Sequence, residues 1–417
     1  MLDIPAELFL MISTHLDHRD LRALATSSQS LCSLLLPEYL RRRGLVLKDL
    51  PCRGASVELR DLGAYASLGL WSVARNFHPP KDVYCSIPYG AKEAQSAMGF
   101  LVHFLQEHSN ACNLQSFHVY LRSDPYLLTF GLCQIERLLR VLPLKELCIS
   151  GFCSEDYLPP PIILRGGWSF GSCTLTSLTI SSDHAFTPLL VRTTMGILKH
   201  SPIKDLVINM VSLNPSQWST LLGELKMKLL EDVEFGGDIP RPSLIRFLTM
   251  HRGLKRICIR GDVASGRAVP TRSSHQHFFP SLRTLRAPLA VCFDVVKRIG
   301  DASILFEVDV EVSRLQPYDP LLLRLMESLW RFPKLDNFGF RIRPSPQSDM
   351  PQESPSDHNW DEHPACRLKQ VRTLAFVQAQ GRLSPGDIVC PHLLSPIFLI
   401  LCTDRTRCAP LCKHFRC

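Results

Sequence analysis

One stretch of the chain has the residue types and spacing of a hydrolase nucleophile. Residues 167–171, Gly-Trp-Ser-Phe-Gly, match the form G-x-S-x-G, with Ser169 as the candidate nucleophile. That chemistry requires a strand before the serine and a helix after it, so that a sharp turn holds the hydroxyl exposed. Residues 162–164 are apolar enough for the strand, but residues 173–180 alternate like another strand and leave no room for a helix. We therefore expect no hydrolase activity.

The candidates for metal ligands have no recognisable spacing. His275 and His277 form a close pair in a polar stretch, and residues 408–417 contain three cysteines and one histidine. Neither set has the ligand spacing of a known zinc module. The sequence also contains no H-E-x-x-H motif, no P-loop and no Cys-x-x-Cys pair. We expect no catalytic residues, no metal and no cofactor, and hence a protein that is not an enzyme.

Composition limits the class of protein and its partners. The chain has 417 residues, 45% of them hydrophobic and 21% charged, as in globular proteins. A net charge of +8 without a recognisable module predicts no nucleic-acid partner, and the lack of any apolar run of about 18 residues predicts no membrane span. The 16 cysteines are scattered and no secretory signal precedes them, which favours reduced thiols in the cytoplasm, the nucleus or both.

The first 43 residues have the pattern of three short helices. Pro5 suits a first helical turn, and Leu8, Ile12 and Leu16 then recur at the spacing of one apolar stripe. Asp20 is a candidate N-cap for a second helix, and Ser27 or Ser28 for a third.

This stretch resembles the F-box family. The family pattern begins with Leu/Ile-Pro and continues with Glu-Leu, an apolar Ile, a Leu, Asp-Leu and a Ser-rich third helix. The residues that match it are Ile4, Pro5, Glu7, Leu8, Ile12, Leu16, Asp20, Leu21 and Ser28, with Leu31 and Leu34 following. The resemblance covers about a tenth of the chain. It implies a three-helix module that docks on the Skp-type adaptor of a cullin–RING ubiquitin ligase.

The residues that we expect to contact that adaptor are the apolar ones of the motif. They are Ile4, Pro5, Leu8, Ile12, Leu16, Leu21 and Leu31. Part of this set must close the core of the three helices, and the sequence does not separate contact from core. An ordinary helical hairpin, or a cap on whatever follows, is the alternative.

A second pattern recurs from residue 114 onward. An apolar residue is followed by two variable residues, a second apolar residue, one variable residue and a third apolar residue. The pattern begins at Leu114, Leu144, Leu175, Ile203, Leu230, Leu254, Leu282, Leu305, Leu335 and Val371. Most intervals contain a helix-like stretch, such as residues 126–142, 188–200, 215–226, 242–251 and 320–332. A strand and a helix cannot bury their own apolar faces, but stacked copies can.

These units resemble leucine-rich repeats with long, irregular spacing. The asparagine that the family carries a few residues past each strand is absent, so curvature and repeat number stay open. The predicted fold class is α/β: an N-terminal three-helix F-box and a leucine-rich-repeat-like solenoid with one parallel strand per repeat. A non-repetitive α/β domain is the alternative, whereas a Rossmann-like domain is disfavoured because no G-x-G-x-x-G follows a strand.

Charged residues at the alternate strand positions segregate by sign. We expect them to face the open side of the solenoid and to bind a protein partner of complementary charge. The candidates are Asp232, Glu234, Arg256, Arg260, Arg286, Glu307, Asp309 and Glu311. A solvated face without a dedicated partner is the alternative.

The predicted organisation is therefore an F-box at residues 1–45, a connector at 46–90, repeats at 91–390 and an atypical tail at 391–417. Residues 343–366 are rich in Pro, Ser and acids and are expected to form a disordered loop within the repeats. The expected function is substrate recognition for an SCF-type ubiquitin ligase, with a Skp-type adaptor, a cullin bound through it, and an unknown protein substrate. A repeat scaffold unrelated to ubiquitin is the alternative.

Overall fold

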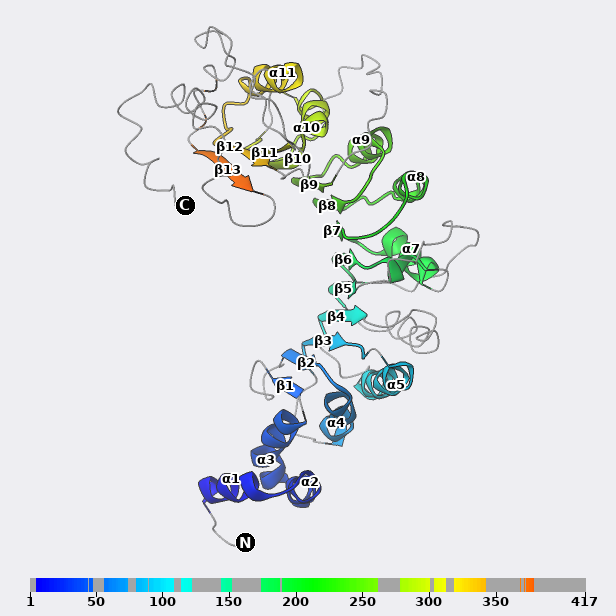
Figure 1. Cartoon of the computed structure of the whole chain (residues 1–417), viewed down its shortest axis with the longest axis vertical. Helices are drawn as coiled ribbons and strands as arrows, with labels where there is room; N and C mark the ends of the chain where they lie inside the picture. Colours follow the sequence, from blue (N-terminus) through cyan, green and yellow to red (C-terminus); the bar gives the residue numbers. More distant parts are fainter. Residues whose placement is uncertain are drawn as a thin grey trace, which may run out of the picture. The chain divides into compact units, whose positions relative to one another are not determined.

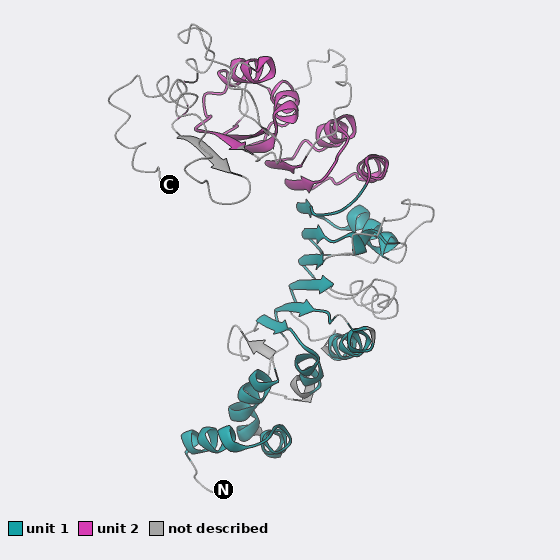
Figure 2. Cartoon of the chain, in the orientation of Figure 1, with its two compact units in different colours: residues 1–213 teal, residues 214–417 magenta. Residues whose placement is uncertain are grey.

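The computed structural model describes most of the chain outside its long loops. The described residues are 5–43, 45–47, 56–73, 80–88, 90–108, 114–121, 144–151, 174–187, 190–261, 278–300, 304–312, 319–342, 368, 371 and 373–378. The chain folds as two compact units, residues 1–213 (unit 1) and residues 214–417 (unit 2) (Figure 2).

Three helices open unit 1: α1 (Ala6–His15), α2 (His18–Ser27) and α3 (Gln29–Arg42) (Figure 1). The Asp17 carboxylate accepts from the backbone N–H of Asp20 at 2.8 Å and caps α2. The cap is thus Asp17 and not the predicted Asp20, because α2 begins at His18 and Asp20 lies in its first turn. Ser28, one of the two predicted caps of α3, accepts from the N–H of Leu31 at 3.2 Å.

The described strands of unit 1 form a row in chain order. They are β1 (Leu45–Leu47), β2 (Ser56–Leu59), β3 (Asp82–Ser86), β4 (Ser116–Leu121), β5 (Glu146–Gly151), β6 (Ser177–Ser181) and β7 (Asp205–Ile208). β1 pairs antiparallel with β2, and each later strand pairs parallel with the one before it. The intervening helices lie on one side of the row (Figure 1): α4 (Leu62–Val73), α5 (Ala91–His108), the 3-10 helix η3 (Asp183–Phe186) and α7 (Val191–His200).

Unit 2 repeats the same plan. Its described strands are β8 (Asp232–Gly236), β9 (Arg256–Arg260), β10 (Thr284–Pro288), β11 (Glu307–Val312), β12 (Asn337–Ile342) and β13 (Thr373–Gln378). Each pairs parallel with its neighbour in chain order. The helices are α8 (Pro215–Glu224), α9 (Arg241–Met250), α10 (Leu289–Val296) and α11 (Pro320–Leu329). Asn214 and Asp319 cap α8 and α11, and each of these helices has a proline at its first position, where the missing N–H costs nothing.

The repeated apolar positions in the sequence account for the row of parallel strands. All ten predicted strands exist, and each runs parallel to its neighbours within its unit. In β6, Leu178 and Ile180 are buried while Thr179 between them is half-buried, because side chains alternate across a strand. The α/β class and one parallel strand per repeat are therefore confirmed.

The segment expected to be a connector, residues 46–90, instead begins the row. It contains β2 and β3, which pair parallel with each other and with β4. Val57, Leu59, Val83 and Cys85 fill the second and third apolar positions of the repeat pattern and are buried. The first position holds Gly54 and Pro80 instead of a large apolar residue, so the pattern did not reveal these strands.

Two further differences concern helices and loops. α10 was not predicted, because its apolar residues follow β10 directly and no polar N-cap residue separates the helix from the strand. The helix expected at residues 126–142, the loop at 343–366 and the tail at 391–417 lie outside the described residues.

Candidate functional site

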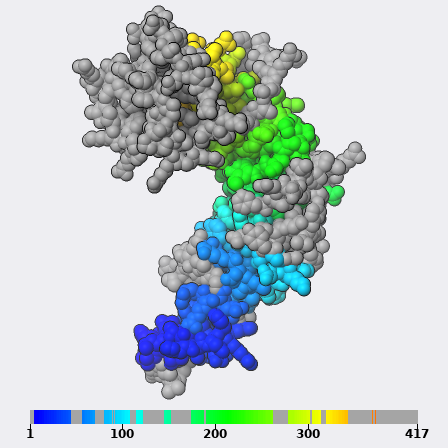
Figure 3. Space-filling view, in the orientation of Figure 1, coloured from blue at the N-terminus to red at the C-terminus, as the bar shows by residue number. Residues whose placement is uncertain are grey.

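Helix α1 carries apolar side chains on its outer surface. The exposed fractions of Leu8, Leu10, Met11 and Ile12 are 47%, 41%, 63% and 46%. Leu8, Met11 and Ile12 are spaced i, i+3 and i+4, so they share one face of the helix. Figure 3 shows the atoms of α1 to α3, in dark blue, at the surface of unit 1. An exposed apolar face of this kind is a candidate interaction site.

The inner face of α1 is formed by other residues. Phe9 is half-buried and Ser13 is buried, four residues apart on α1, and Leu16, which follows the helix, is also half-buried. Residues 8–12 are five consecutive apolar residues, so a helix through them must be apolar on every side. One side packs on the module and the others remain at the surface.

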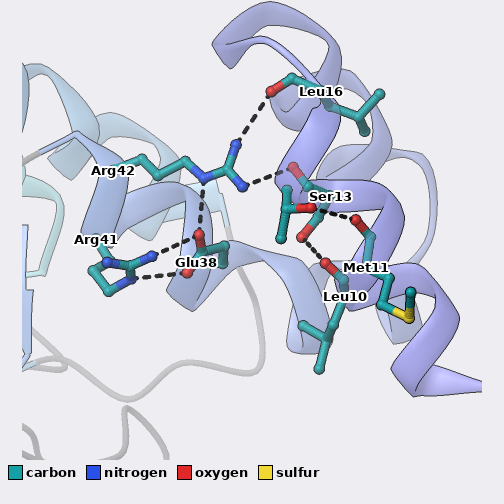
Figure 4. Close-up of polar contacts among 8 residues, drawn as sticks. Leu10, Met11, Ser13, Leu16, Glu38, Arg41 and Arg42 are labelled. Atoms are coloured by element: carbon teal, nitrogen blue, oxygen red, sulfur yellow. Dashed lines mark hydrogen bonds and ion pairs between the residues drawn. The ribbon is translucent and has the colours of Figure 1, made fainter.

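The C-terminal end of α1 is held by Arg42 of α3. Arg42 Nη2 donates to the carbonyl of Ser13 at 2.7 Å, and Nη1 donates to the carbonyl of Leu16 at 3.2 Å (Figure 4). These carbonyls lie where a helix leaves its last acceptors unsatisfied, and a cation suits the negative end of the helix dipole. Arg42 therefore fixes the position of α1 on α3.

Glu38 in turn orients Arg42. Its carboxylate accepts from Arg42 Nε at 2.8 Å and from Arg41 Nε and Nη2, both at 2.8 Å (Figure 4). The hydrogen bond from Arg41 is the main cause that lowers the pKa of Glu38, with Arg42 contributing. Glu38 is thus a carboxylate at neutral pH, and we call Glu38 and Arg42 the latch.

The structure divides the predicted adaptor residues into three groups. Pro5, Leu8 and Ile12 are exposed, and Leu16 and Leu31 are half-buried. Leu21 has no exposed surface and belongs to the core of the module. Ile4 lies outside the described residues. Leu10 and Met11 are exposed apolar residues that the motif did not include, although the run at residues 8–12 was the signal for them.

The predicted charged residues of unit 2 lie on neighbouring strands and segregate by sign as expected. Asp232 and Glu234 are on β8, Arg256 and Arg260 on β9, Arg286 on β10, and Glu307, Asp309 and Glu311 on β11. All lie at alternate strand positions, and Glu311 is buried.

These charges pair across the strands. Arg256 lies 3.3 Å from Asp232 and Arg260 lies 3.1 Å from Glu234. Asp309 is 2.8 Å from Arg286 and 3.8 Å from Arg341 of β12. Neighbouring strands of opposite sign therefore partly neutralise each other, and the binding of a partner of complementary charge by these residues stays a prediction.

The other chemical candidates gain no support. Among the described residues, no three His, Cys, Asp or Glu side chains are grouped as a metal site would require. Ser169, His275, His277 and residues 408–417 lie outside the described residues. Within the described part of the chain, every helix is too short or too polar to span a bilayer.

Comparison with known proteins gives a likeness in structure alone. No family model matches the chain, and no curated protein matches it. Among solved structures, it is similar to the leucine-rich repeat-containing protein LegL7 from Legionella pneumophila, with 11% identity and a TM-score of 0.35, over 84% of this chain and 98% of that one. The parallel rows are established by their own strand register and not by this likeness.

Proposed function

We propose that the protein is a substrate-recognition subunit of an SCF-type ubiquitin ligase. Helices α1 to α3 form an F-box that binds a Skp-type adaptor and, through it, a cullin. The strand–helix units are divergent leucine-rich repeats that bind the protein to be ubiquitinated. The observation that carries the proposal is the exposed apolar face of α1 at the motif positions Leu8 and Ile12.

The energetics of that face favour a permanent or high-affinity partner. Burying a Leu, Ile or Met side chain completely contributes about 1.5–3 kcal/mol of free energy. The side chains of the α1 face are about half exposed, so a partner that covers them would add roughly half of that for each. Leu8, Met11 and Ile12 together supply a compact anchor of the kind found at interface centres. Leaving such a face in water favours aggregation, which an adaptor would prevent.

The mechanism is positioning without bond chemistry. A receptor that holds the adaptor with one surface and a substrate with another raises the effective concentration of substrate lysines near the charged conjugating enzyme. No cofactor or metal is needed for this role. The protein would act in the cytoplasm, the nucleus or both, where the ligase and reduced cysteines occur.

The second candidate is a repeat scaffold in which α1 to α3 only cap the row. One observation favours it: α3 packs on β1, which pairs with β2 at the start of the row. The module is thus continuous with the repeats. A cap, however, turns its apolar side chains toward the row, whereas α1 turns Leu8 and Met11 outward.

Co-purification of the full chain with a Skp-type adaptor tests the proposal. We expect the wild type to bind, and Leu8→Asp and Met11→Asp each to abolish binding, because a carboxylate in an apolar interface stays unpaired. Leu229→Asp is the matched control, since Leu229 is a comparably exposed leucine of unit 2. Circular dichroism verifies that each variant is folded. An intact chain that does not bind any Skp-type adaptor would leave the scaffold as the better account.

A further inference from the structure

Unit 1 has an open strand face that differs in charge from that of unit 2. At the alternate, half-exposed positions of β2 to β7 there are four carboxylates and no lysine or arginine. The corresponding positions of β8 to β12 carry five carboxylates and four arginines, several of which pair. At these positions unit 1 therefore has an excess of carboxylates, although Glu58 pairs with Arg60, directly after β2, at 3.0 Å, whereas the charges of unit 2 nearly balance.

The carboxylates of unit 1 are regularly spaced. The strand register makes successive partners of Ser56, Asp82, Ser116, Glu146, Ser177 and Asp205, so every second strand presents an acid (the acid row). Ser56 Oγ donates to Asp82 at 2.9 Å, and Ser116 Oγ donates to Glu146 at 3.3 Å. These bonds orient the carboxylates, and the side chain of Glu146 is still 44% exposed.

An aromatic row lies beside the acid row. Two residues after Asp82 and Ser116, the register pairs Tyr84 of β3 with His118 of β4. Their rings stack with centroids 4.4 Å apart and an interplanar angle of 15°. Burial first, and then the negative charges of Asp82 and Glu146, raise the pKa of Tyr84. The ring pair therefore lies beside both acids, and His118 Nε2 is 3.7 Å from the Glu146 carboxylate. The two rings cover one face of each other, and the parts that remain accessible can attract cations and proline rings.

The spacing of the acid row selects a ligand conformation. Strands lie about 4.8 Å apart, so acids on every second strand are about 9.6 Å apart. A polyproline II helix has three residues per turn and a rise of about 3.1 Å, so every third side chain points the same way at about 9.3 Å. An extended β-strand repeats at about 6.7 Å and does not match.

We infer that the open face of unit 1 binds a proline-rich segment of a protein partner in the polyproline II conformation, with arginine or lysine at every third residue. The cations face Asp82, Glu146 and Asp205, and the prolines between them pack beside Tyr84 and His118. Charged carboxylates accept two parallel hydrogen bonds from arginine, which favours arginine over lysine. This inference rests on the proposed function only in naming the bound segment part of the substrate.

A lysine precedes each carboxylate of the acid row. These lysines restrict where a bound cation can lie, and one of them provides a control variant. Lys81, Lys145 and Lys204 are exposed and directly precede β3, β5 and β7. They stand at the edge of the face and oppose any cation that is out of register. Lys145→Gln is thus the matched control for Glu146→Gln.

The test is a titration of the full chain with a synthetic peptide of four Pro-Pro-Arg repeats, followed by calorimetry at low salt. A peptide of the same composition with its arginines consecutive is the comparison. We expect the spaced peptide to bind about fivefold or more tightly than the clustered one, and Asp82→Asn and Glu146→Gln each to weaken it about fivefold. Lys145→Gln should not weaken it.

Equal binding of the two peptides, or affinities that the acid-row variants leave unchanged, would overturn the inference. The same preparations are tested for adaptor binding in parallel. A chain that binds the adaptor but not the spaced peptide would contradict this inference alone. A chain that binds the peptide but not the adaptor would contradict the proposed function alone.

Discussion

At the residue scale, His251 is a buried histidine that the fold holds neutral. Its Nε2 lies 3.0 Å from the backbone N–H of Met227, and its Nδ1 lies 2.7 Å from the carbonyl of Phe247. Nε2 must therefore accept while Nδ1 donates, which defines one neutral tautomer. Burial lowers the pKa of His251.

This pKa predicts the direction of a pH effect on stability. Below about pH 6.5 the unfolded chain binds a proton at His251 that the folded chain resists, so stability falls as pH decreases through that value. We expect His251→Gln to lower the melting temperature at pH 7.5 and to reduce its decline between pH 7 and 5.5. The measurement is thermal unfolding of both chains across that range. Parallel curves for the two chains would show that His251 does not titrate in this way.

Two leucines of the N-terminal module distinguish core from contact. Leu21→Ala removes a fully buried side chain and is expected to destabilise the module by about 2–5 kcal/mol. Leu8→Ala removes a half-exposed one, so it should leave stability within about 1 kcal/mol and weaken adaptor binding. Hydrogen exchange of α2 and α3 reports the first effect and adaptor affinity the second. Comparable losses of stability in both variants would contradict this division.

At the element scale, the latch determines where α1 sits. Arg42→Ala leaves the carbonyls of Ser13 and Leu16 without their donor, which we expect to cost about 1–2 kcal/mol of α1 docking. Adaptor affinity should fall about five- to thirtyfold, and α1 amides should exchange faster while α2 is unchanged. Arg42→Lys should recover only part of the loss, because an ammonium lacks the guanidinium fork.

Exchanging the charges of Glu38 and Arg42 tests whether the latch acts through the hydrogen bonds of Arg42 to the end of α1 or only through the attraction between the two charges. Combining Glu38→Arg with Arg42→Glu keeps an opposite-charge pair but places a carboxylate, which has no donor, at the end of α1. We expect no recovery of adaptor affinity. Full recovery would mean that the pair acts only by its mutual attraction.

The ion pairs between β8 and β9 are expected to contribute little to stability. The side chains of Arg256 and Arg260 are 54% and 56% exposed, and pairs this accessible are typically worth about 0.2–1 kcal/mol. A double-mutant cycle on Asp232 and Arg256 should give a coupling energy within that range, falling as salt increases. A coupling above about 2 kcal/mol would show that the face is more shielded than these fractions indicate.

The elements also show how far the sequence could predict this structure. The ten strands from β4 to β13 were predictable because their three apolar positions define one buried face. β2 and β3 were not, since Gly54 and Pro80 occupy the first of those positions. The location of the exposed apolar site on α1 was predicted, but the residues that face solvent were not. Residues 8–12 are all apolar, so no helical periodicity in the sequence separates the exposed face from the packed face. The acid row depends on register between strands far apart in sequence, which no single stretch encodes.

At the scale of the whole molecule, both proposed surfaces belong to unit 1 and share no residue. Leu8 and Met11 lie on α1, whereas Asp82 and Glu146 lie on β3 and β5. Sites without common residues usually act additively, so we treat adaptor binding and segment binding as independent. Ubiquitination would then need both sites on one chain, because positioning works by linking two partners through a single receptor.

This requirement predicts that a chain defective in adaptor binding and a chain defective in segment binding do not complement each other when mixed. In a reconstituted ligase, a reporter with spaced Pro-Pro-Arg repeats and a nearby lysine should be ubiquitinated by the wild type. Leu8→Asp and Glu146→Gln should each reduce the rate, the first completely and the second about fivefold. Mixing Leu8→Asp with Glu146→Gln should give no more product than Glu146→Gln alone. Since the chain that binds the reporter well cannot reach the adaptor, restored activity in the mixture would mean that the receptors associate, and positioning by a single chain would be wrong.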